Sequence, residues 1–286
     1  DLLFTSGGTE ANNTALRGHG RERTLVSAGE HEAVLQARAD AEPVALTPAG
    51  TVDLDALDAA LAADARPALV SVMLANNETG AINPIERVVE IARRHGARVH
   101  CDAVQAPGKI PVDAGDLGVD LLTVSSHKLG GPQGVGALVV LDGQPLAPLL
   151  AGGGQERKQR AGTENVPAIA GFGAAAAAAR ADLDRMAGLA AWRDRLEVEA
   201  RALCPRVQLH GAAAPRLPNT SCLGLPGVRA ETQVMALDLA GVAVSSGSAC
   251  SSGKVHASHV LRAMGVSEAD AESAIRVSLG WDSGES

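Results

Sequence analysis

The sequence predicts an α/β protein with a mostly parallel central sheet that helices cover on both faces, followed by a smaller α+β C-terminal lobe. The first observation is that short β-branched runs alternate with segments of helical period in the first half of the chain, as in βαβ units. The second is a change of pattern after residue 162, where a stretch rich in Ala, Leu and Arg begins. The third is size, because 286 residues with 46% hydrophobic content exceed an average domain and supply a substantial core.

Strands and helices of the first half follow from these patterns. Six apolar runs predict strands, at residues 2–6, 24–28, 68–75, 97–103, 119–126 and 136–141. Helices are predicted between them. Leu54, Leu57 and Leu61 share one face of the segment 51–64, and the segment 84–96 has a proline near its start and a glycine at its end.

The second half predicts a connecting helical region and then the smaller lobe. Residues 167–203 predict one long helix or two shorter ones, with no chemistry of their own. The lobe is predicted from strand-like runs at 206–211, 219–225 and 242–246 and a helical run at 229–241. We therefore expect a large domain at residues 1–180 and a small domain at residues 181–286.

Composition excludes several classes of protein. The net charge is −8 and the basic residues are scattered, which argues against nucleic acid as a partner. No apolar run reaches the ~18 residues that a membrane span requires. The four cysteines lie far apart and form no C-x-x-C pair, a pattern typical of a reducing, cytoplasmic setting rather than of a disulfide framework.

Polar residues that could bind or react with a ligand follow the predicted strands, at the positions where ligands bind in open α/β sheets. After the first strand, Gly7 and Gly8 precede Thr9 at the start of a predicted helix, which suits a phosphate. A helix cap at Thr9 is the alternative. After the strand at 68–75 comes NNETG, with Asn77 as its second residue, for which an Asn-rich turn is the alternative.

Two later strand ends complete a possible cofactor site. Asp102 follows the run ARVH near the end of the strand at 97–103, three residues before Gln105; it either balances a buried cation or caps a helix. Ser125, His127 and Lys128 leave the strand at 119–126 and enter a glycine-rich turn. A lysine in such a place is commonly a surface residue, but it could form a Schiff base with a carbonyl cofactor. Pyridoxal phosphate (PLP) needs that lysine, an acid for its ring nitrogen and a phosphate cradle. The chain offers each part in strand order: Thr9, Asp102, Ser125, His127 and Lys128.

Nine motifs together resemble the cysteine desulfurases of the NifS/IscS type, which are fold-type I PLP enzymes of aminotransferase class V. The resemblance covers essentially the whole chain, in order and with compatible spacing. The motifs are FTSGGTEANN, HEAVL, NNETG, HCDAVQ, SSHKLGGPQGVG, GGGQERKQRAGTEN, SSGSACSSG, SHVLRAMG and IRVSLG.

The resemblance implies a role for each matching residue. It implies Lys128 as the Schiff-base lysine, Asp102 as the partner of the ring nitrogen and His31 as the residue that stacks on the ring and helps proton transfer. Gln105 is implied to bind the ring oxygen, and Asn77 is the cofactor-side amide. The phosphate cradle implied by the match consists of Gly8, Thr9, Ser125 and His127. Thr163 matches a threonine that reaches the phosphate of the neighbouring subunit, which implies a homodimer.

The implied reaction converts L-cysteine to L-alanine and leaves sulfur on Cys250 as a persulfide. Arg276 matches the arginine that binds the substrate carboxylate. Cys250 matches the catalytic cysteine, and it stands among Ser and Gly rather than in an apolar run. Cys101, Cys204 and Cys222 match no catalytic position and are interpreted as packing residues. A persulfide implies a sulfur-accepting partner, such as an iron–sulfur scaffold or a tRNA-thiolation factor.

Alternatives and expected differences from the family accompany this interpretation. A selenocysteine lyase, another class V aminotransferase and an inactive fragment of the family remain open. Glycine-rich GPQGVG and AGGGQE lack the features of a dinucleotide fingerprint. The two histidines of HASH, at 256–259, make a poor zinc site, and no metal is expected. We expect the sequence to be truncated at both ends, without the family's N-terminal arm, its substrate-binding asparagine and its final helix.

Overall fold

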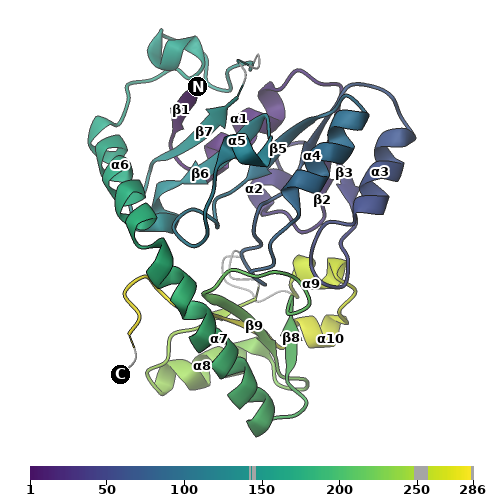
Figure 1. Ribbon diagram of the computed structural model, residues 1–286, viewed down its shortest axis with the longest axis vertical. Helices are drawn as coiled ribbons and strands as arrows, with labels where there is room; N and C mark the ends of the chain where they lie inside the picture. The colour runs from purple at the N-terminus through teal and green to yellow at the C-terminus, as the bar shows by residue number, and fades with distance from the viewer. Residues whose placement is uncertain (142, 144–145, 248–256, 285–286) are drawn as a thin grey trace. The chain divides into compact units, whose positions relative to one another are not determined.

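The computed structural model describes residues 1–141, 143, 146–247 and 257–284. The chain divides into two compact units, each described here by itself (Figure 1). The large unit comprises residues 1–45, 52–75 and 83–183. The small unit comprises residues 46–51, 76–82 and 184–286, so two short segments of the N-terminal half belong to it.

A seven-stranded sheet forms the centre of the large unit, with the order β1-β7-β6-β5-β4-β2-β3. Its strands are β1 (Leu2–Thr5), β2 (Arg23–Ser27), β3 (Glu42–Val44), β4 (Ala68–Ser71), β5 (Arg98–Asp102), β6 (Leu121–Ser125) and β7 (Gly136–Val140). β7 runs antiparallel to both of its neighbours, and all other pairs are parallel. The prediction of a mostly parallel sheet is confirmed.

Helices lie on both sides of this sheet (Figure 1). They are α1 (Gly8–Gly18), α2 (Glu32–Leu35), α3 (Leu54–Ala62), α4 (Ile85–Arg94), α5 (Ala114–Leu117) and α6 (Val166–Ala181), with short 3₁₀ helices η1 (Ser126–Leu129) and η2 (Gln155–Lys158). α1 packs against β1, β5, β6 and β7, whereas α4 packs against β5 and α3. Leu3, Leu16, Leu69, Leu121 and Leu138 belong to the buried core between α1 and the strands.

Local signals in the sequence explain several boundaries. α3 begins after Asp53, whose carboxylate accepts hydrogen bonds from the amides of the next turn. α4 begins after Pro84, and Gly96 follows it with a φ of 65°, which favours glycine. β3 was not predicted, because it is a three-residue edge strand that contains Pro43.

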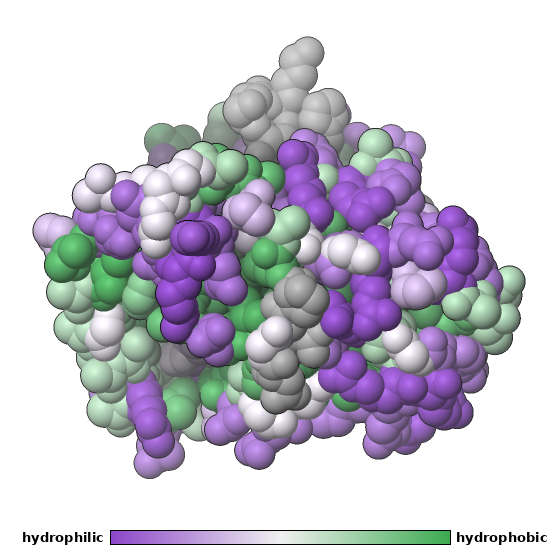
Figure 2. Space-filling model, turned by 90° about the horizontal axis from the view of Figure 1, so that it is seen from above, coloured by the Kyte–Doolittle hydropathy of each residue, from purple (hydrophilic) through white to green (hydrophobic). Residues whose placement is uncertain are grey.

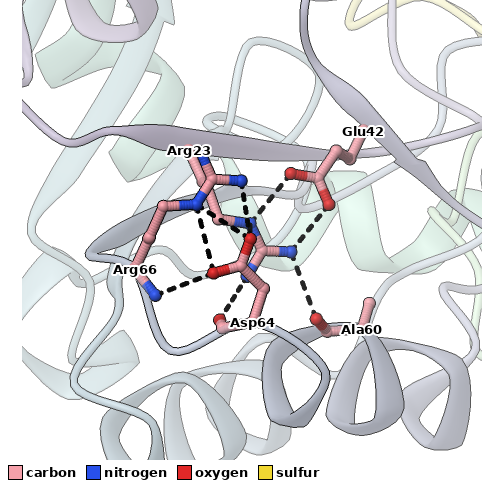
Figure 3. A network of polar contacts seen from close by, with 5 residues as sticks. All are labelled: Arg23, Glu42, Ala60, Asp64 and Arg66. Carbon is pink, nitrogen blue, oxygen red and sulfur yellow. Dashed lines mark hydrogen bonds and ion pairs between the residues drawn. The ribbon is translucent and has the colours of Figure 1, made fainter.

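A buried arginine, Arg23, bonds to neighbouring elements at the edge of the sheet (Figure 3). The Arg23 side chain is 3% exposed; its Nη2 lies 2.7 Å from Oε2 of Glu42, and its Nε lies 3.5 Å from Oδ2 of Asp64. Arg23 also donates to the Ala60 carbonyl oxygen at 3.1 Å. The Arg66 guanidinium hydrogen-bonded to Asp64 lowers the pKa of that carboxyl to about 2. These contacts join β2, β3 and the end of α3.

The small unit contains a four-stranded antiparallel sheet with the order β10-β11-β9-β8. Its strands are β8 (Gln208–His210), β9 (Thr220–Gly224), β10 (Ser245–Ser246) and β11 (Ala274–Ser278). Its helices are α7 (Leu183–Leu203), α8 (Ala230–Leu239), α9 (His259–Ala263) and α10 (Glu268–Ala271), of which α7 starts one residue before the unit. Asp182 separates α6 from α7, so the alanine-rich stretch forms two helices. The strand expected at 242–246 is confirmed only for its last two residues.

The surface is mixed in polarity. Seen from above, hydrophilic residues alternate with hydrophobic ones over the visible face of the molecule (Figure 2). Among the described residues, no helix combines the length and the apolar composition that crossing a membrane requires.

Candidate active site

Three strands of the large unit bring Gly8, Asp102 and Ser125 to the same edge of the sheet. β1, β5 and β6 run in the same direction, so their carboxyl ends meet there. A Cβ atom added to Gly8 would lie 2.9 Å from Val104 Cγ2 and 3.5 Å from Ser125 Cβ. The start of α1 therefore abuts the residues that follow β5 and end β6, and only glycine fits at this position.

The first turn of α1 has the features of an anion site. Gly7 is the N-cap residue and supplies no side-chain hydrogen bond, so the capping role considered for Thr9 is contradicted. Thr9 lies exposed at the second helical position. Glu10 Oε2 instead accepts a hydrogen bond of 2.8 Å from the Ser6 amide. The amides of an uncapped first turn suit a phosphate oxygen, as the sequence predicted.

Asp102 is a buried carboxylate at the end of β5, with 6% of its surface exposed. Its Oδ2 accepts 2.7 Å from Asn12 Nδ2, and its Oδ1 accepts 2.9 Å from the Val104 amide. Burial raises the pKa of Asp102, and the bonds from Val104 and Asn12 and the nearby His31 oppose that rise. No helix starts directly after Asp102, so the alternative that it caps a helix is contradicted.

Asn12 is a site residue that the sequence analysis missed. It lies on α1 among the buried Ala11, Ala15 and Leu16, and its Oδ1 is buried with no partner in the part of the chain that the structure describes. The signal in the sequence was a polar residue on the apolar face of an amphipathic helix. Such a residue requires a buried partner, which here is Asp102.

His31 caps a helix, beside a buried carboxyl. His31 is the N-cap residue of α2, and its Nδ1 accepts 3.1 Å from the Ala33 amide. Glu30 is fully buried, and its Oε1 accepts 2.6 Å from the Met73 amide. Burial and the nearby Asp102 raise the pKa of Glu30 well above its usual value. A neutral Glu30 thus fixes the start of α2 to the end of β4.

η1 carries the candidate Schiff-base lysine. Ser125 Oγ and His127 Nδ1 are 3.0 Å apart. Burial and the adjacent Lys128 lower the pKa of His127, which favours the neutral ring. Lys128 is exposed, and its amine has no hydrogen bond or ion pair within the described residues. The amine is therefore available for a ligand.

Gln105 is oriented by a neighbouring lysine. Lys109 Nζ donates to Gln105 Oε1 and to the Gln105 carbonyl oxygen, each at 2.9 Å. Because Oε1 is occupied, the amide presents Nε2 as a donor to its other side.

Thr163 lies exposed at a small pocket of the large unit. The pocket has a volume of about 100 Å³ and is also lined by Ser6 and Arg160. Arg160 binds Glu10 through Nε at 2.8 Å and Nη2 at 3.1 Å. Burial works against ionisation, but the bonds from Arg160 and Ser6 prevail and lower the pKa of Glu10. Arg160 was not predicted as a functional residue; the pair ties the Thr163 segment to α1.

Asn77 and Arg276 belong to the small unit. Arg276 Nη1 donates 2.8 Å to the Asn77 carbonyl oxygen, and its Nη2 lies 3.3 Å from Ser245 Oγ. Its Nε is buried without a partner, and no carboxylate pairs with the guanidinium among the described residues. Asn76 Oδ1 accepts from the amides of Glu78 and Thr79, so NNETG does form an Asn-based turn.

Two of the cysteines, Cys101 and Cys222, are buried, and Cys250 lies outside the described residues. Burial raises the pKa of the Cys101 and Cys222 thiols. Cys204 is half-buried. Raised pKa values and burial suit packing roles, as the sequence predicted for Cys101 and Cys222. Within the described residues, no cluster of three or more His, Cys, Asp or Glu side chains could hold a metal ion.

Comparisons with known proteins agree over nearly the whole chain. The aminotransferase class-V family model matches residues 1–285. Cysteine desulfurases from Cereibacter sphaeroides and Sinorhizobium fredii are 45% and 43% identical; each match covers 98% of this chain and 74% or 75% of the relative. A solved NifS-like protein from Rickettsia africae has a TM-score of 0.91 at 34% identity, over 99% of this chain and 77% of that one. SspA, solved in complex with cysteine, has a TM-score of 0.79 at 28% identity, over 97% of this chain and 81% of that one. The chain therefore belongs to the aminotransferase class-V family, among the NifS-like cysteine desulfurases.

Proposed function

We propose that this chain is a PLP-dependent cysteine desulfurase, which converts L-cysteine to L-alanine and transfers the sulfur to Cys250. The observation that carries the proposal is the 45% identity to a cysteine desulfurase over 98% of the chain. The relative solved with cysteine supports L-cysteine as the substrate. The geometry of the large unit supports the cofactor.

The residues of the large unit fit PLP. At Gly8 a Cβ atom would fill the space beside Val104 and Ser125, and α1 begins without a side-chain cap, as a phosphate cradle requires. Gly8, Thr9, Ser125 and His127 would hold the phosphate, and Lys128 would hold the aldehyde carbon. Gln105 Nε2 would donate to the ring oxygen. When bound, PLP supplies an electron sink for the substrate Cα.

Asp102 would face the ring nitrogen as a carboxylate. Its two hydrogen-bond donors, Asn12 Nδ2 and the Val104 amide, stabilise the charged form, whereas burial opposes it. A protonated ring nitrogen would favour the charged form further, because an opposite charge at short range lowers a carboxyl pKa. Asn12 is therefore a positioning residue for Asp102.

The hydrogen bond at His31 favours Lys128 as the base. Because His31 Nδ1 accepts from the Ala33 amide, the neutral ring carries its proton on Nε2. In that tautomer Nε2 donates and cannot accept a proton. We therefore assign removal of the substrate α-proton to the Lys128 amine, and assign ring stacking and proton donation to His31.

In this proposal Arg276 would bind the substrate carboxylate and Asn77 would contact the cofactor. Both residues belong to the small unit. The Arg276 guanidinium lacks a carboxylate partner among the described residues, and its Nε is buried without a partner. A substrate carboxylate would pair with the guanidinium and would accept a hydrogen bond from Nε. The Asn77 carbonyl oxygen holds the guanidinium in place.

Cys250 would accept the sulfur as a thiolate. Its sulfur forms a bond to the substrate Sγ while the substrate Cβ–Sγ bond breaks; the electron pair of that bond stays with carbon, which takes a proton and becomes the methyl group of alanine. An unperturbed cysteine thiol has a pKa of about 8.5, which leaves a reactive fraction near neutral pH. The persulfide then passes to a sulfur-accepting protein, such as an iron–sulfur scaffold or a tRNA-thiolation factor.

The proposal includes a homodimer and a reducing, cytoplasmic setting. The exposed position of Thr163 supports its predicted reach to the phosphate of a second subunit. A pattern of cysteines without a C-x-x-C pair supports a reducing compartment, where Cys250 stays a thiol.

The decisive experiment measures alanine formation from L-cysteine with added PLP and reductant. Cys250→Ser is expected to abolish alanine formation, whereas the matched control Cys204→Ser retains it. Equal alanine formation by the wild type and Cys250→Ser contradicts sulfur transfer to Cys250 and favours another class V reaction. No alanine from the wild type contradicts the proposed function.

A further inference from the structure

Glu78 is a buried carboxyl in the small unit, at the centre of the NNETG turn. It is 4% exposed, and its Oε2 accepts a hydrogen bond from Ser258 Oγ. Asn76 Oδ1 accepts 2.9 Å from the Glu78 amide and 3.0 Å from the Thr79 amide, which fixes the backbone of the turn. None of the roles assigned above uses the Glu78 side chain.

Ser258 connects Glu78 to one end of a segment, and Gly247 at the other end of that segment bonds to the sheet. Ser258 is buried and is the N-cap of α9, where its Oγ accepts 3.1 Å from the Leu261 amide. Gly247 donates 2.9 Å to the Ala274 carbonyl oxygen, and a Cβ added to Gly247 would lie 3.8 Å from Glu78 Oε2. In the sequence, Gly247 and Ser258 flank the residues that include Cys250.

The same turn also holds Arg276. The Asn77 carbonyl oxygen, one residue before Glu78, accepts 2.8 Å from Arg276 Nη1. Arg276 pairs in register with Ser245, two residues before Gly247. Burial raises the pKa of Glu78, and Ser258, His259 and Arg276 lower it, so three of its neighbours favour the charged form.

We propose that Glu78 is a positioning residue that anchors Ser258, at the C-terminal flank of the Cys250 segment, in the same turn whose Asn77 carbonyl oxygen holds the guanidinium of Arg276. Because the carboxylate binds the N-cap residue of α9, the position of this flank is set by a side chain and not by the sheet alone. The effect on turnover rests on the proposed desulfurase function, whereas the effect on this flank does not.

The first test is amide hydrogen exchange, which needs no turnover. In Glu78→Ala, the amides of the first turn of α9 are expected to exchange about tenfold faster, since the buried hydrogen bond from its N-cap Ser258 to a carboxylate is lost. Glu78→Gln keeps an acceptor oxygen for Ser258 and is expected to restore most of the protection. The control is Ser221→Ala, which removes the 2.7 Å bond from Ser221 Oγ to the buried Glu197 in the same unit. It should leave these amides unchanged.

The second test is steady-state kinetics with the cofactor absorbance recorded in parallel. Glu78→Ala is expected to lower kcat for alanine about tenfold with PLP content and absorbance unchanged, and Ser221→Ala is expected to retain wild-type kcat. Unchanged exchange in the first turn of α9 in Glu78→Ala, or equal losses in Glu78→Ala and Ser221→Ala, would overturn the proposal. Faster exchange in a protein that makes no alanine would support the anchoring role and refute only the desulfurase function.

Discussion

Asn12 Nδ2 donates a hydrogen bond of 2.7 Å to Oδ2 of Asp102, which joins two residues 90 positions apart in the chain. The bond connects α1, whose first turn is the proposed phosphate cradle, to the strand end that carries the buried acid. Together with the Val104 amide, this side chain orients Asp102 and favours its charged form.

Replacing Asn12 by alanine is expected to weaken PLP binding about tenfold. Loss of the donor raises the pKa of Asp102 further and leaves its carboxylate with one fewer hydrogen bond, at a cost of ~1–3 kcal/mol. Absorbance titration of the apoprotein with PLP measures the effect. Asn13→Ala is the control, because Asn13 donates only to backbone oxygens. An equal loss of affinity in both variants would contradict the assignment.

Glu30→Gln is expected to stabilise the apoprotein more at pH 8 than at pH 5. Burial raises the folded pKa of Glu30 above its unfolded value, so the folded state holds the proton over a range where the unfolded state has lost it. That contribution is complete below the unfolded pKa of about 4.3 and is lost as the pH rises through the folded value. Glutamine keeps the acceptor for Met73 and cannot ionise.

Urea unfolding of the apoprotein at the two pH values measures this difference. Exposed Glu22→Gln serves as the control and should give no comparable change between them. A stability difference between Glu30→Gln and the wild type that stays constant with pH would argue against a neutral Glu30.

Arg23→Ala is expected to lower the free energy of unfolding by about 3 kcal/mol, because it leaves polar partners at the sheet edge without their cation. The Arg23 side chain is 3% exposed, but Glu42 is 43% exposed and recovers part of its solvation. Arg66→Ala removes a 57% exposed side chain from the same network and should cost at most ~1 kcal/mol. Denaturant unfolding compares the two, and equal losses would refute the role given to burial.

Cys101 and Cys222 are expected to resist alkylation in the native protein. Burial raises both thiol pKa values and excludes the reagent. Mass spectrometry after iodoacetamide treatment should find both thiols unmodified, and modified only after denaturation. Rapid native labelling of either one would contradict its packing role.

The residues at the strand ends could be predicted because each follows a short apolar run and precedes a helix or glycine-rich turn. Gly8, Asp102 and Ser125 are near one another for a reason that the pattern contains: parallel strands bring their carboxyl ends to one edge. The strand at Glu42–Val44 was missed, because three residues with a proline carry no periodic signal.

Partners that depend on distant contacts could not be predicted. Asn12 lies on the apolar face of its helix, which marks it as a buried polar residue, but nothing in the local sequence identifies Asp102 as its partner. Glu78 likewise lies in a polar turn, and only the fold gives it Ser258 as a partner 180 residues away.

The sequence by itself therefore determined the order of strands and helices, the class of fold and the residue types that suit PLP, because periodicity and turn chemistry are local properties of the chain. The tertiary structure alone decided the reversed direction of β7, the donors that control the charge of Asp102 and the burial of Glu30 and Glu78. The physical reason is that pairing, desolvation and charge are set by neighbours in space, and those neighbours come from segments far apart in the chain.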